Sequence, residues 1–531
     1  MGKLQETANA SFDPALNSIN GRWGSDPTVK IMDDETYRLI QMDDVYAAVN
    51  YTKTITGAFT LRRSLRQPLT DAELITEKQK SLDELRSDRK LRDKVTGFVE
   101  KAIKDEEAFY GFNAKEYSTR WAGWPTIYTS YKGSVRFMRS LMEGLKVAPE
   151  SDYLRALTQN LTDLREDEVS DFIRGPLRTT FRGLRRPKEI GRPIPEPFMS
   201  FYATDFKPIR LAIFGAPAAW ILPMMFSGDS TTMQLTMLAE IFYVLGYIPM
   251  AIGMGRKFDE AVFTEPFRKL AYSNPRVINA VESLGKLDEL LSFANYADSL
   301  QVPITLPQVV DEPVHSFQAR GLRNPALVKA NPDYVPNDVN LDGASVTFLT
   351  GSNSGGKTAL TKTILQAQVL AQAGSYIPAE LARIAVADRI LYQSRMVNRM
   401  QDQEGGFGVE AERTKEIVFG VPRGRFIVGL DDLMGATTFE EGSRHSEDIL
   451  DGLYTLGGNT IFVTHNHELA ESFKRKKRGQ FWQVEFADKR PTHKIKPGIS
   501  TESHSDYVLE RIGFTREDIQ KHLEGLEINS A

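Results

Sequence analysis

The segment Gly351–Thr358 constrains the fold of this chain more than any other part of its sequence. It reads GSNSGGKT and has the GxxxxGK[ST] spacing of a phosphate-binding loop. An apolar, β-rich stretch precedes it at 344–350, and an Ala-, Leu- and Gln-rich stretch typical of a helix follows at 359–372. A strand, a glycine turn and a helix start place successive backbone N–H groups around a phosphate. A chance match would lack these flanking elements, so the sequence predicts a nucleotide site.

Each residue of this loop has a predicted role in that site. Lys357 would reach the β- and γ-phosphates, and the hydroxyl of Thr358 would bind Mg²⁺. The residues that would form the cradle of backbone N–H groups are Gly351, Ser352, Asn353, Ser354, Gly355 and Gly356.

Two later apolar runs supply the second half of the predicted site. Residues 425–432 read RFIVGLDD, a strand that ends in Asp431 and Asp432. We expect Asp431 to bind Mg²⁺ and Asp432 to orient or deprotonate the attacking water; the alternative is two solvated acids at a surface strand end. His465 follows the run 460–464, at the strand end where α/β sheets bind ligands. It would sense the γ-phosphate or polarise water, although a single histidine at such a place is more often structural.

With these motifs the chain resembles the MutS-like ATPases, whose best-known members are the DNA mismatch-repair proteins. Thr350–Thr358 is similar to the family's TGPNxxGKS loop, including an asparagine that other phosphate loops lack. Phe462–His465 is similar to its FATH strand, and Phe407–Glu410 to the FMVEM segment of its signature loop. Tyr334–Asp338 is similar to its FVPND segment, whose aromatic residue stacks on adenine. Residues 62–69 resemble the start of its helical core and lever region.

The resemblance implies an α + α/β fold, in which a long helical core and lever region precedes an ABC-type P-loop ATPase domain with a mainly parallel sheet. It implies that the chain binds ATP and Mg²⁺, with Tyr334 at the adenine, and hydrolyses ATP to switch a homodimer that acts on DNA. Because the resemblance begins near residue 45, we expect this sequence not to include the family's mismatch-reading N-terminal domain. Asp432 stands where the family uses Glu; its carboxylate is about 1.5 Å closer to the backbone, so we expect slow hydrolysis.

The pattern of residues along the chain predicts four parts. We interpret residues 1–30 as a flexible lead-in, 31–310 as the helical core and lever region, 311–500 as the ATPase domain and 501–531 as a helical segment. Within the second part, Thr70 followed by Glu73 is a plausible capping box for a helix that carries Ile75, Leu82 and Leu85 at helical spacing.

Residues 208–256 allow more than one interpretation. Leu211–Phe226 and Met233–Met254 are long apolar runs whose basic flanks lie on one side of the intervening turn, which favours a membrane hairpin. Pro217, Pro223 and Glu240 argue against it. The alternatives are a buried helical hairpin and an oligomer contact. A membrane hairpin would make the protein a membrane-attached ATPase switch with a protein or lipid partner.

Composition narrows the remaining choices. The net charge of −4 means that any DNA contact must be local, and the candidates are the basic stretches 172–193 and 474–478. There are no cysteines, so disulfides and thiolate metal sites are excluded. The first residues lack the apolar core of a signal peptide, so we expect a cytoplasmic catalytic domain. If residues 208–256 form a membrane hairpin, this domain would be membrane-associated. A transport or chromosome-organising ATPase is disfavoured, because no LSGGQ-like signature lies between the nucleotide motifs.

Overall fold

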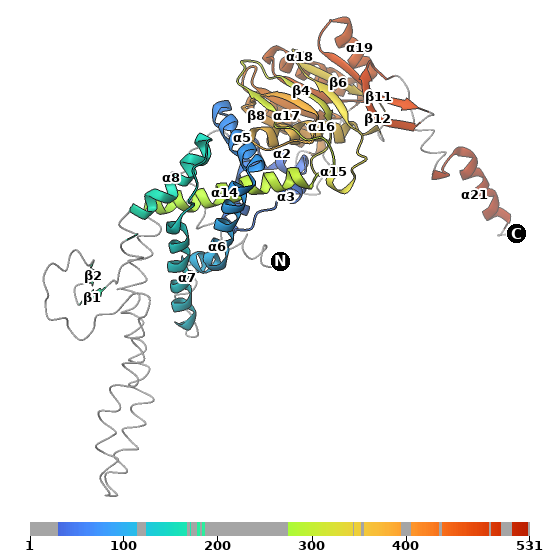
Figure 1. Ribbon diagram of the computed structural model, residues 1–531. Coiled ribbons are helices and arrows are strands. Elements are labelled where there is room, and N and C mark those ends of the chain that lie inside the picture. The colour runs from blue at the N-terminus through green and yellow to red at the C-terminus, as the bar shows by residue number, and fades with distance from the viewer. Residues whose placement is uncertain are drawn as a thin grey trace, which may run out of the picture.

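The computed structural model describes residues 30–113, 124–166, 170, 178–180, 183–185, 274–343, 345–351, 355–394, 405–434, 438–487, 490–500 and 512–528. Figure 1 shows a helical region, coloured blue to light green, beside a region of sheets and helices coloured yellow to red. The two regions contain the helices predicted for the first half of the chain and the α/β alternation predicted for the second.

The helical region is built around one long helix, α14 (Pro275–Ser299). It packs against α4, α5 and α8, while α6 packs along α7. The other helices are α2 (Asp34–Leu39), α3 (Met42–Val49), α4 (Ile55–Arg66), α5 (Ala72–Ser87), α6 (Arg89–Asn113), α7 (Trp124–Glu143) and α8 (Asp152–Glu166). Glycine permits the close crossing of α4 and α14, because a Cβ on Gly285 would lie 2.4 Å from Thr60 Oγ1.

One detail of the predicted helix start is wrong. The residue that caps α5 is Asp71, whose carboxylate accepts hydrogen bonds from the backbone N–H groups of Glu73 and Leu74. Thr70 therefore lies one residue outside the helix. Both residue types cap helices well, and only the backbone path decides between neighbours. The predicted apolar face is confirmed, since Ile75, Leu82 and Leu85 are buried.

The main sheet has the strand order β12-β11-β6-β10-β9-β8, and all neighbours are parallel except β11 and β12. The strands are β6 (Val346–Thr350), β8 (Arg389–Ser394), β9 (Phe426–Asp431), β10 (Asn459–Val463), β11 (Gln480–Ala487) and β12 (Arg490–Pro497). The strands predicted at 346–350, 426–430 and 460–464 are thus confirmed. β6 and β10 are buried along their whole length, as expected for parallel strands covered on both faces.

Helices cover both faces of this sheet. On one face Leu349, Ile427 and Ile461 join the core cluster that contains α16 (Lys357–Gln372) and the helical region. On the other face Phe348 and Phe462 join a second cluster. That cluster draws on α17 (Gly405–Gly420), α18 (Phe439–Leu456) and α19 (His467–Arg475).

A second, four-stranded sheet has the order β3-β7-β4-β5. Its strands are β3 (Gln308–Val310), β4 (Phe317–Leu322), β5 (Asn337–Asn340) and β7 (Leu381–Ala385), with the short helix α15 (Leu327–Ala330) between β4 and β5. No strand was predicted from the sequence between residue 311, where the predicted ATPase domain begins, and residue 340. The strands were missed because they are short and carry polar side chains such as Gln318 and Arg320 on one face.

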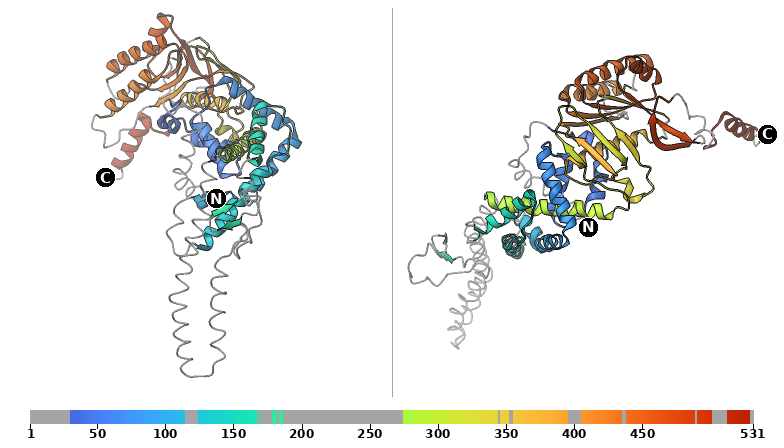
Figure 2. Two further views of the ribbon diagram at one scale, coloured as in Figure 1. Left: turned by 90° about the vertical axis from the view of Figure 1, so that its left-hand side faces the viewer. Right: turned by 45° about the horizontal axis from the view of Figure 1, so that its top comes forward.

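The helix α16 joins the sheet to the helical region, and both views of Figure 2 show the first helices lying against the sheets. Gln366 donates a hydrogen bond to the carbonyl of Ile40 (2.7 Å), and Gln372 donates one to the carbonyl of Leu69 (2.7 Å). Because α16 begins at the phosphate loop, the loop and the helical region share one rigid element.

Several predictions concern segments for which little or nothing is described. The apolar hairpin of 208–256 lies outside the described residues, and of 172–193 only the backbone of β1 (Arg178–Thr180) and β2 (Gly183–Arg185), an antiparallel pair, is described. Among the residues that the structure does describe, no helix is both long and apolar enough to cross a membrane. Near the C-terminus, α21 (Arg516–Ile528) lies where a helix was expected.

Candidate functional site

The phosphate loop has the predicted strand–turn–helix geometry. The backbone leaves β6 at Gly351 with φ 128° and enters α16 at Gly356 with φ 86°, both values that favour glycine. A Cβ on Gly355 would lie 2.8 Å from Val484 Cγ2, so the loop packs closely against β11. Ser352, Asn353 and Ser354 lie outside the described residues. The first turn of α16 therefore stands at the carboxyl end of β6, where its N–H groups can face an anion.

Lys357 is held inside this turn. Its Nζ donates a hydrogen bond to the carbonyl of Gly351 at 2.7 Å and lies 3.4 Å from His465 Nε2. Burial lowers the pKa of Lys357 to about 8, against the opposing effect of Asp432 and Asp431. Because the Lys357 ammonium group is poorly hydrated, its charged form is stabilised when an anion such as a phosphate comes close.

Asp431 and Thr358 meet across the end of the sheet. Thr358 Oγ1 donates a hydrogen bond of 2.6 Å to Asp431 Oδ2, and the hydroxyl of Tyr392 donates one of 3.2 Å to the same oxygen. Burial raises the pKa of Asp431 despite these bonds. A hydroxyl and a carboxylate that converge in this way fit Mg²⁺, which takes few protein oxygens and completes its shell with phosphate and water.

The other two predicted catalytic residues lie beside this pair. Asp432 has φ 52°, and its N–H donates a hydrogen bond to the carbonyl of Val463 (3.1 Å), which ties it to the end of β10. Asp tolerates this left-handed conformation better than most residues. The pKa of His465 is lowered, first by burial and then by Lys357, so the imidazole is neutral at pH 7. The structure thus brings Lys357, Thr358, Asp431 and His465 together, with Asp432 beside them.

Tyr334 precedes β5 along the chain, and it contacts α16 away from the phosphate loop. Its hydroxyl is 3.5 Å from Thr363 Oγ1, and burial raises its pKa. Thr363 belongs to the second turn of the helix that Lys357 begins. The aromatic ring predicted at the adenine is therefore placed along the same helix as the phosphate loop.

Sequence reasoning missed the β11–β12 hairpin, which closes one side of the loop. His493 Nδ1 would be 3.4 Å from a Cβ on Gly356. Asn337 holds the hairpin in place: its amide donates to the carbonyl of His493 (3.0 Å) and accepts from the N–H of Ile495 (2.9 Å). Asn337 belongs to the segment that resembles FVPND, but only the fold shows that its partner lies 156 residues away.

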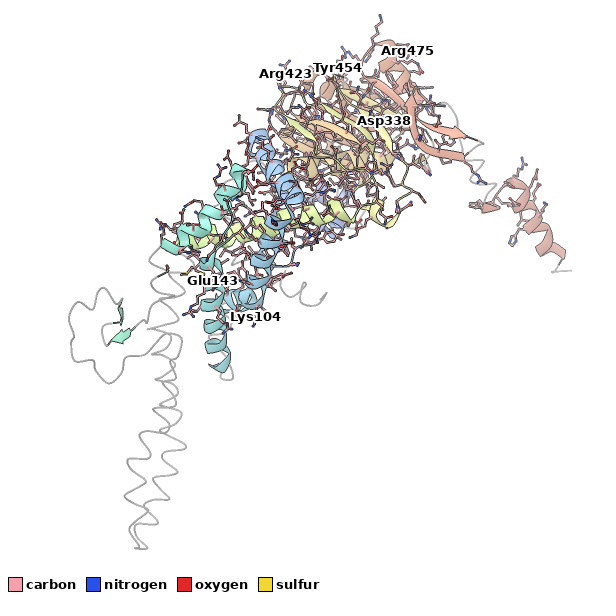
Figure 3. The ribbon with its side chains drawn as sticks, viewed as in Figure 1. Lys104, Glu143, Asp338, Arg423, Tyr454 and Arg475 are labelled. Atoms are coloured by element: carbon pink, nitrogen blue, oxygen red, sulfur yellow. The ribbon has the colours of Figure 1, made fainter. Side chains whose placement is uncertain are left out.

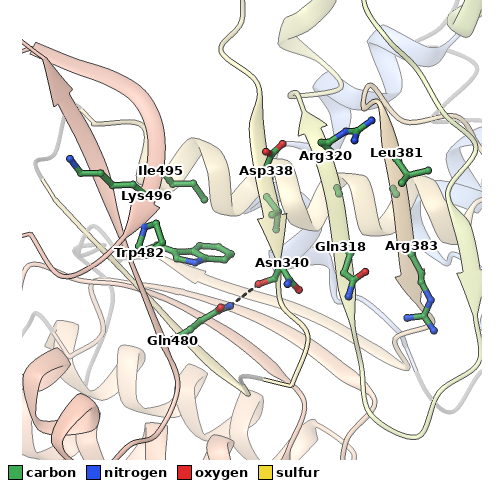
Figure 4. A pocket seen from close by; sticks show the side chains of 14 residues that line it. Gln318, Arg320, Asp338, Asn340, Leu381, Arg383, Gln480, Trp482, Ile495 and Lys496 are labelled. Atoms are coloured by element: carbon green, nitrogen blue, oxygen red, sulfur yellow. Dashed lines mark hydrogen bonds between the residues drawn. The ribbon is translucent and has the colours of Figure 1, made fainter.

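A groove of about 570 Å³ lies apart from the phosphate loop, between the four-stranded sheet and the β11–β12 hairpin (Figure 4). Gln480 donates a hydrogen bond to the carbonyl of Asn340 (2.9 Å) at its edge. Two of its cations are already in ion pairs, since Arg320 contacts Glu380 at 2.8 Å and Arg383 contacts Glu312. The groove contains none of the predicted site residues.

The basic stretch 474–478 is committed largely to the fold. Lys476 pairs with Glu447 (2.9 Å) and Asp451 (3.1 Å), and Arg478 pairs with Asp451 (2.9 Å). Lys474 pairs with Glu471 (3.5 Å). Figure 3 places Arg475 and Tyr454 at the far end of the sheet region from Lys104 and Glu143 of the helical region. Three of the five cations of this stretch thus pair with acids of α18 and α19.

The fold and the loop together define a phosphate-loop protein of the α/β class joined to a helical region. Comparison with known families gives the next step. A model of MutS domain III matches residues 39–294, and a model of MutS domain V matches residues 347–526. The chain belongs to the MutS-like family, which confirms the resemblance predicted from its motifs.

Individual relatives give the same result. The chain is 32% identical over 260 residues to the DNA mismatch repair protein MSH3 of Mycosarcoma maydis, which is 45% of this chain and 22% of that protein. It is 28% identical over 287 residues to the DNA mismatch repair protein MutS of Myxococcus xanthus, covering 51% of this chain and 32% of that protein. It is 28% identical over 211 residues to human DNA mismatch repair protein Msh6, covering 37% of this chain and 15% of that protein. The chain thus spans less than a third of the length of each of these relatives.

Proposed function

We propose that this chain binds ATP with Mg²⁺, hydrolyses it slowly, and uses the cycle to switch a homodimer that acts on DNA. The observation that carries this proposal is the contact of Thr358 Oγ1 with Asp431 Oδ2 at 2.6 Å, beside the buried Lys357. Membership of the MutS-like family supports the same reaction.

In this proposal each site residue has one task. The N–H groups of Gly351–Gly356 surround the phosphates, Lys357 compensates their charge, and Tyr334 lies at the base. Thr358 and Asp431 would hold Mg²⁺, which when bound neutralises the charge that develops on the phosphates. Asp432 orients or deprotonates the attacking water, and His465, neutral and 3.4 Å from Lys357, senses the γ-phosphate.

The nucleotide part is tested by the variant Lys357→Ala. It removes the cation that faces the β- and γ-phosphates, so ATP affinity or turnover is expected to fall at least about tenfold. Lys476→Ala is the matched control, because it removes a lysine that pairs with Glu447 and is not one of the predicted site residues. Equal ATP binding and hydrolysis in wild type and Lys357→Ala would refute the assignment.

The proposal of a dimer rests on the start of α17. Phe407 is 39% exposed, and Glu410, three residues later, is buried. What supports the proposal is that Phe407–Glu410 resembles the segment that completes a partner's site in the MutS-like family. Sedimentation with ATP should give a dimer; a monomer at all concentrations would contradict this.

Action on DNA is supported by the relatives, each of which is a DNA mismatch repair protein by name. The decisive experiment compares DNA binding by the purified protein with ATP and with ADP, over a salt series, on matched, mismatched and branched duplexes. We expect nucleotide-dependent affinity for at least one of them. The membrane-attached alternative rests only on residues 208–256, which lie outside the described residues.

A further inference from the structure

The side chain of Tyr392 has no place in the motifs, yet it touches the predicted metal ligand. Tyr392 lies on β8, is fully buried, and donates its hydroxyl to Asp431 Oδ2 at 3.2 Å. Thr358 Oγ1 donates to the same oxygen. Two hydroxyl donors on Oδ2 fix the rotation of the carboxylate and direct Oδ1 away from both of them.

The neighbouring strand is shaped to let the tyrosine ring reach that position. Tyr392 is paired with Gly429 of β9, two residues before Asp431 on the same strand. A Cβ on Gly429 would lie 2.8 Å from Tyr392 Cδ2 and 2.8 Å from Thr361 Cγ2 of α16. The glycine therefore leaves the space in which the ring lies between the sheet and α16.

The backbone of Tyr392 is held from outside the sheet. β8 is an edge strand, and α2 packs against its unpaired side. There the N–H of Tyr392 donates a hydrogen bond to Thr36 Oγ1 at 3.1 Å. Arg413 of α17 donates to the same Thr36 oxygen (3.1 Å), to the carbonyl of Tyr392 (3.4 Å) and to Asp33 (3.0 Å). Both the ring and the backbone of Tyr392 are thus fixed by buried contacts.

We propose that Tyr392 is a positioning residue that holds the carboxylate of Asp431 in the orientation needed for Mg²⁺ with nucleotide. It acts through Asp431 and touches neither metal nor phosphate itself. Because Arg413 lies six residues after Phe407 on α17, the orientation of Asp431 is linked to the segment that faces the partner in the proposed dimer. This inference rests on the proposed function, in which Asp431 is a metal ligand.

The test is the variant Tyr392→Phe, which keeps the ring and removes only the hydroxyl. Binding of Mn²⁺ would be followed by electron paramagnetic resonance at a fixed concentration of ATP, with ATP affinity measured separately in EDTA. Metal affinity is expected to fall about five- to tenfold, the equivalent of one ordinary hydrogen bond. ATP affinity in EDTA should stay unchanged.

Tyr296→Phe is the matched control. Tyr296 is also fully buried and donates its hydroxyl to a carbonyl, that of Pro325, at 2.9 Å. Its removal should cost similar stability and leave Mn²⁺ binding as in wild type. Equal metal affinity in Tyr392→Phe and Tyr296→Phe would overturn the inference while leaving the proposed function intact. A wild-type protein that binds no metal with ATP would instead overturn the proposed function.

A second pair of variants decides the question if Tyr392→Phe does not fold. Thr36→Val removes the acceptor for the N–H of Tyr392, and Thr36→Ser keeps it. We expect weaker Mn²⁺ binding in Thr36→Val, by about twofold or more, and recovery in Thr36→Ser. Equal metal affinity in this pair would overturn the inference.

Discussion

Two pairs of carboxylates, Asp288 with Glu106 in the helical region and Asp431 with Asp432 at the carboxyl end of β9, have opposite surroundings. In the helical region, Asp288 of α14 accepts hydrogen bonds from the N–H groups of Lys53 (2.9 Å) and Thr54 (2.7 Å). Glu106 of α6 accepts from those of Ile55 (2.7 Å) and Thr56 (2.8 Å). These four N–H groups lie at the start of α4. The first N–H groups of a helix have no acceptor within the helix itself. The pair therefore closes the N-terminus of α4 and fastens three helices together.

At the carboxyl end of β9, Asp431 instead accepts hydrogen bonds from two side-chain hydroxyls, those of Thr358 and Tyr392. A hydroxyl can rotate and bind a metal ion without any change in the backbone, whereas a helix N–H cannot leave its acceptor unless the helix end opens. The comparison teaches that the hydrogen-bond partners of a carboxylate distinguish a structural role from the metal-binding role proposed for Asp431. The residue type alone does not, since Asp288 and Asp431 are both aspartates.

The largest effect that sharpens this comparison is expected from Asp432→Asn. Asparagine keeps the size of the side chain and the backbone bond to Val463, and removes only the charge that would activate water. ATP turnover should fall by about 10²–10⁴-fold with binding retained, because that is the usual contribution of a general base. Single-turnover phosphate release measures it, and Asp432→Glu should be faster than wild type. Normal hydrolysis by Asp432→Asn would remove Asp432 from the mechanism.

Asp288→Ala should give the next largest effect, on stability alone. It leaves the N–H groups of Lys53 and Thr54 and the hydroxyl of Thr54 without their acceptor in a buried place. The free energy of unfolding should fall by roughly 4 kcal/mol, about 1–3 kcal/mol for each unsatisfied donor. Denaturant titration measures this loss. A matching change in ATP affinity of the folded protein would break the distinction between the two pairs.

The smallest effect is the pH dependence of stability caused by Glu106. Burial raises its pKa from the ordinary 4.5 to about 7, with Asp288 adding to the shift and the bonds from Thr56 and Ile55 opposing it. Tyr110, whose pKa burial also raises, faces the same cluster through Thr56. Because the folded pKa is the higher one, the stability that Glu106 contributes is complete below pH 4.5 and is lost as the pH rises through 7.

Thermal unfolding from pH 5 to pH 8 checks this sign. The loss from Glu106 across that window should be on the order of 2–3 kcal/mol. In Glu106→Gln this part of the pH dependence should disappear, while ATP binding at constant pH should not change. A wild-type stability that rises over the same range, with no difference from Glu106→Gln, would show that the buried carboxylate is not the source.

Much of the sheet and of the site could be predicted because local patterns specify them. A strand followed by Gly351–Thr358 and a helix has one geometry, and the apolar runs before Asp431 and His465 place both residues at the carboxyl edge of a parallel sheet. The capping residue of α5 was predicted wrongly, and the strands of the second sheet were not predicted. In those places neighbouring residues are equally suitable or the alternation of polar and apolar residues is too short to detect.

The sequence by itself determined the class of fold, the phosphate loop and the family, because each is written in residues that are close along the chain. Only the tertiary structure decided which buried polar groups meet. The contacts of Asn337 with His493, of Tyr392 with Asp431 and Thr36, and of Asp288 with Thr54 join residues 156, 39, 356 and 234 positions apart. Such pairs follow no spacing rule, since burial favours a partner for most polar groups and only the packing of helices on sheets determines which one is within reach.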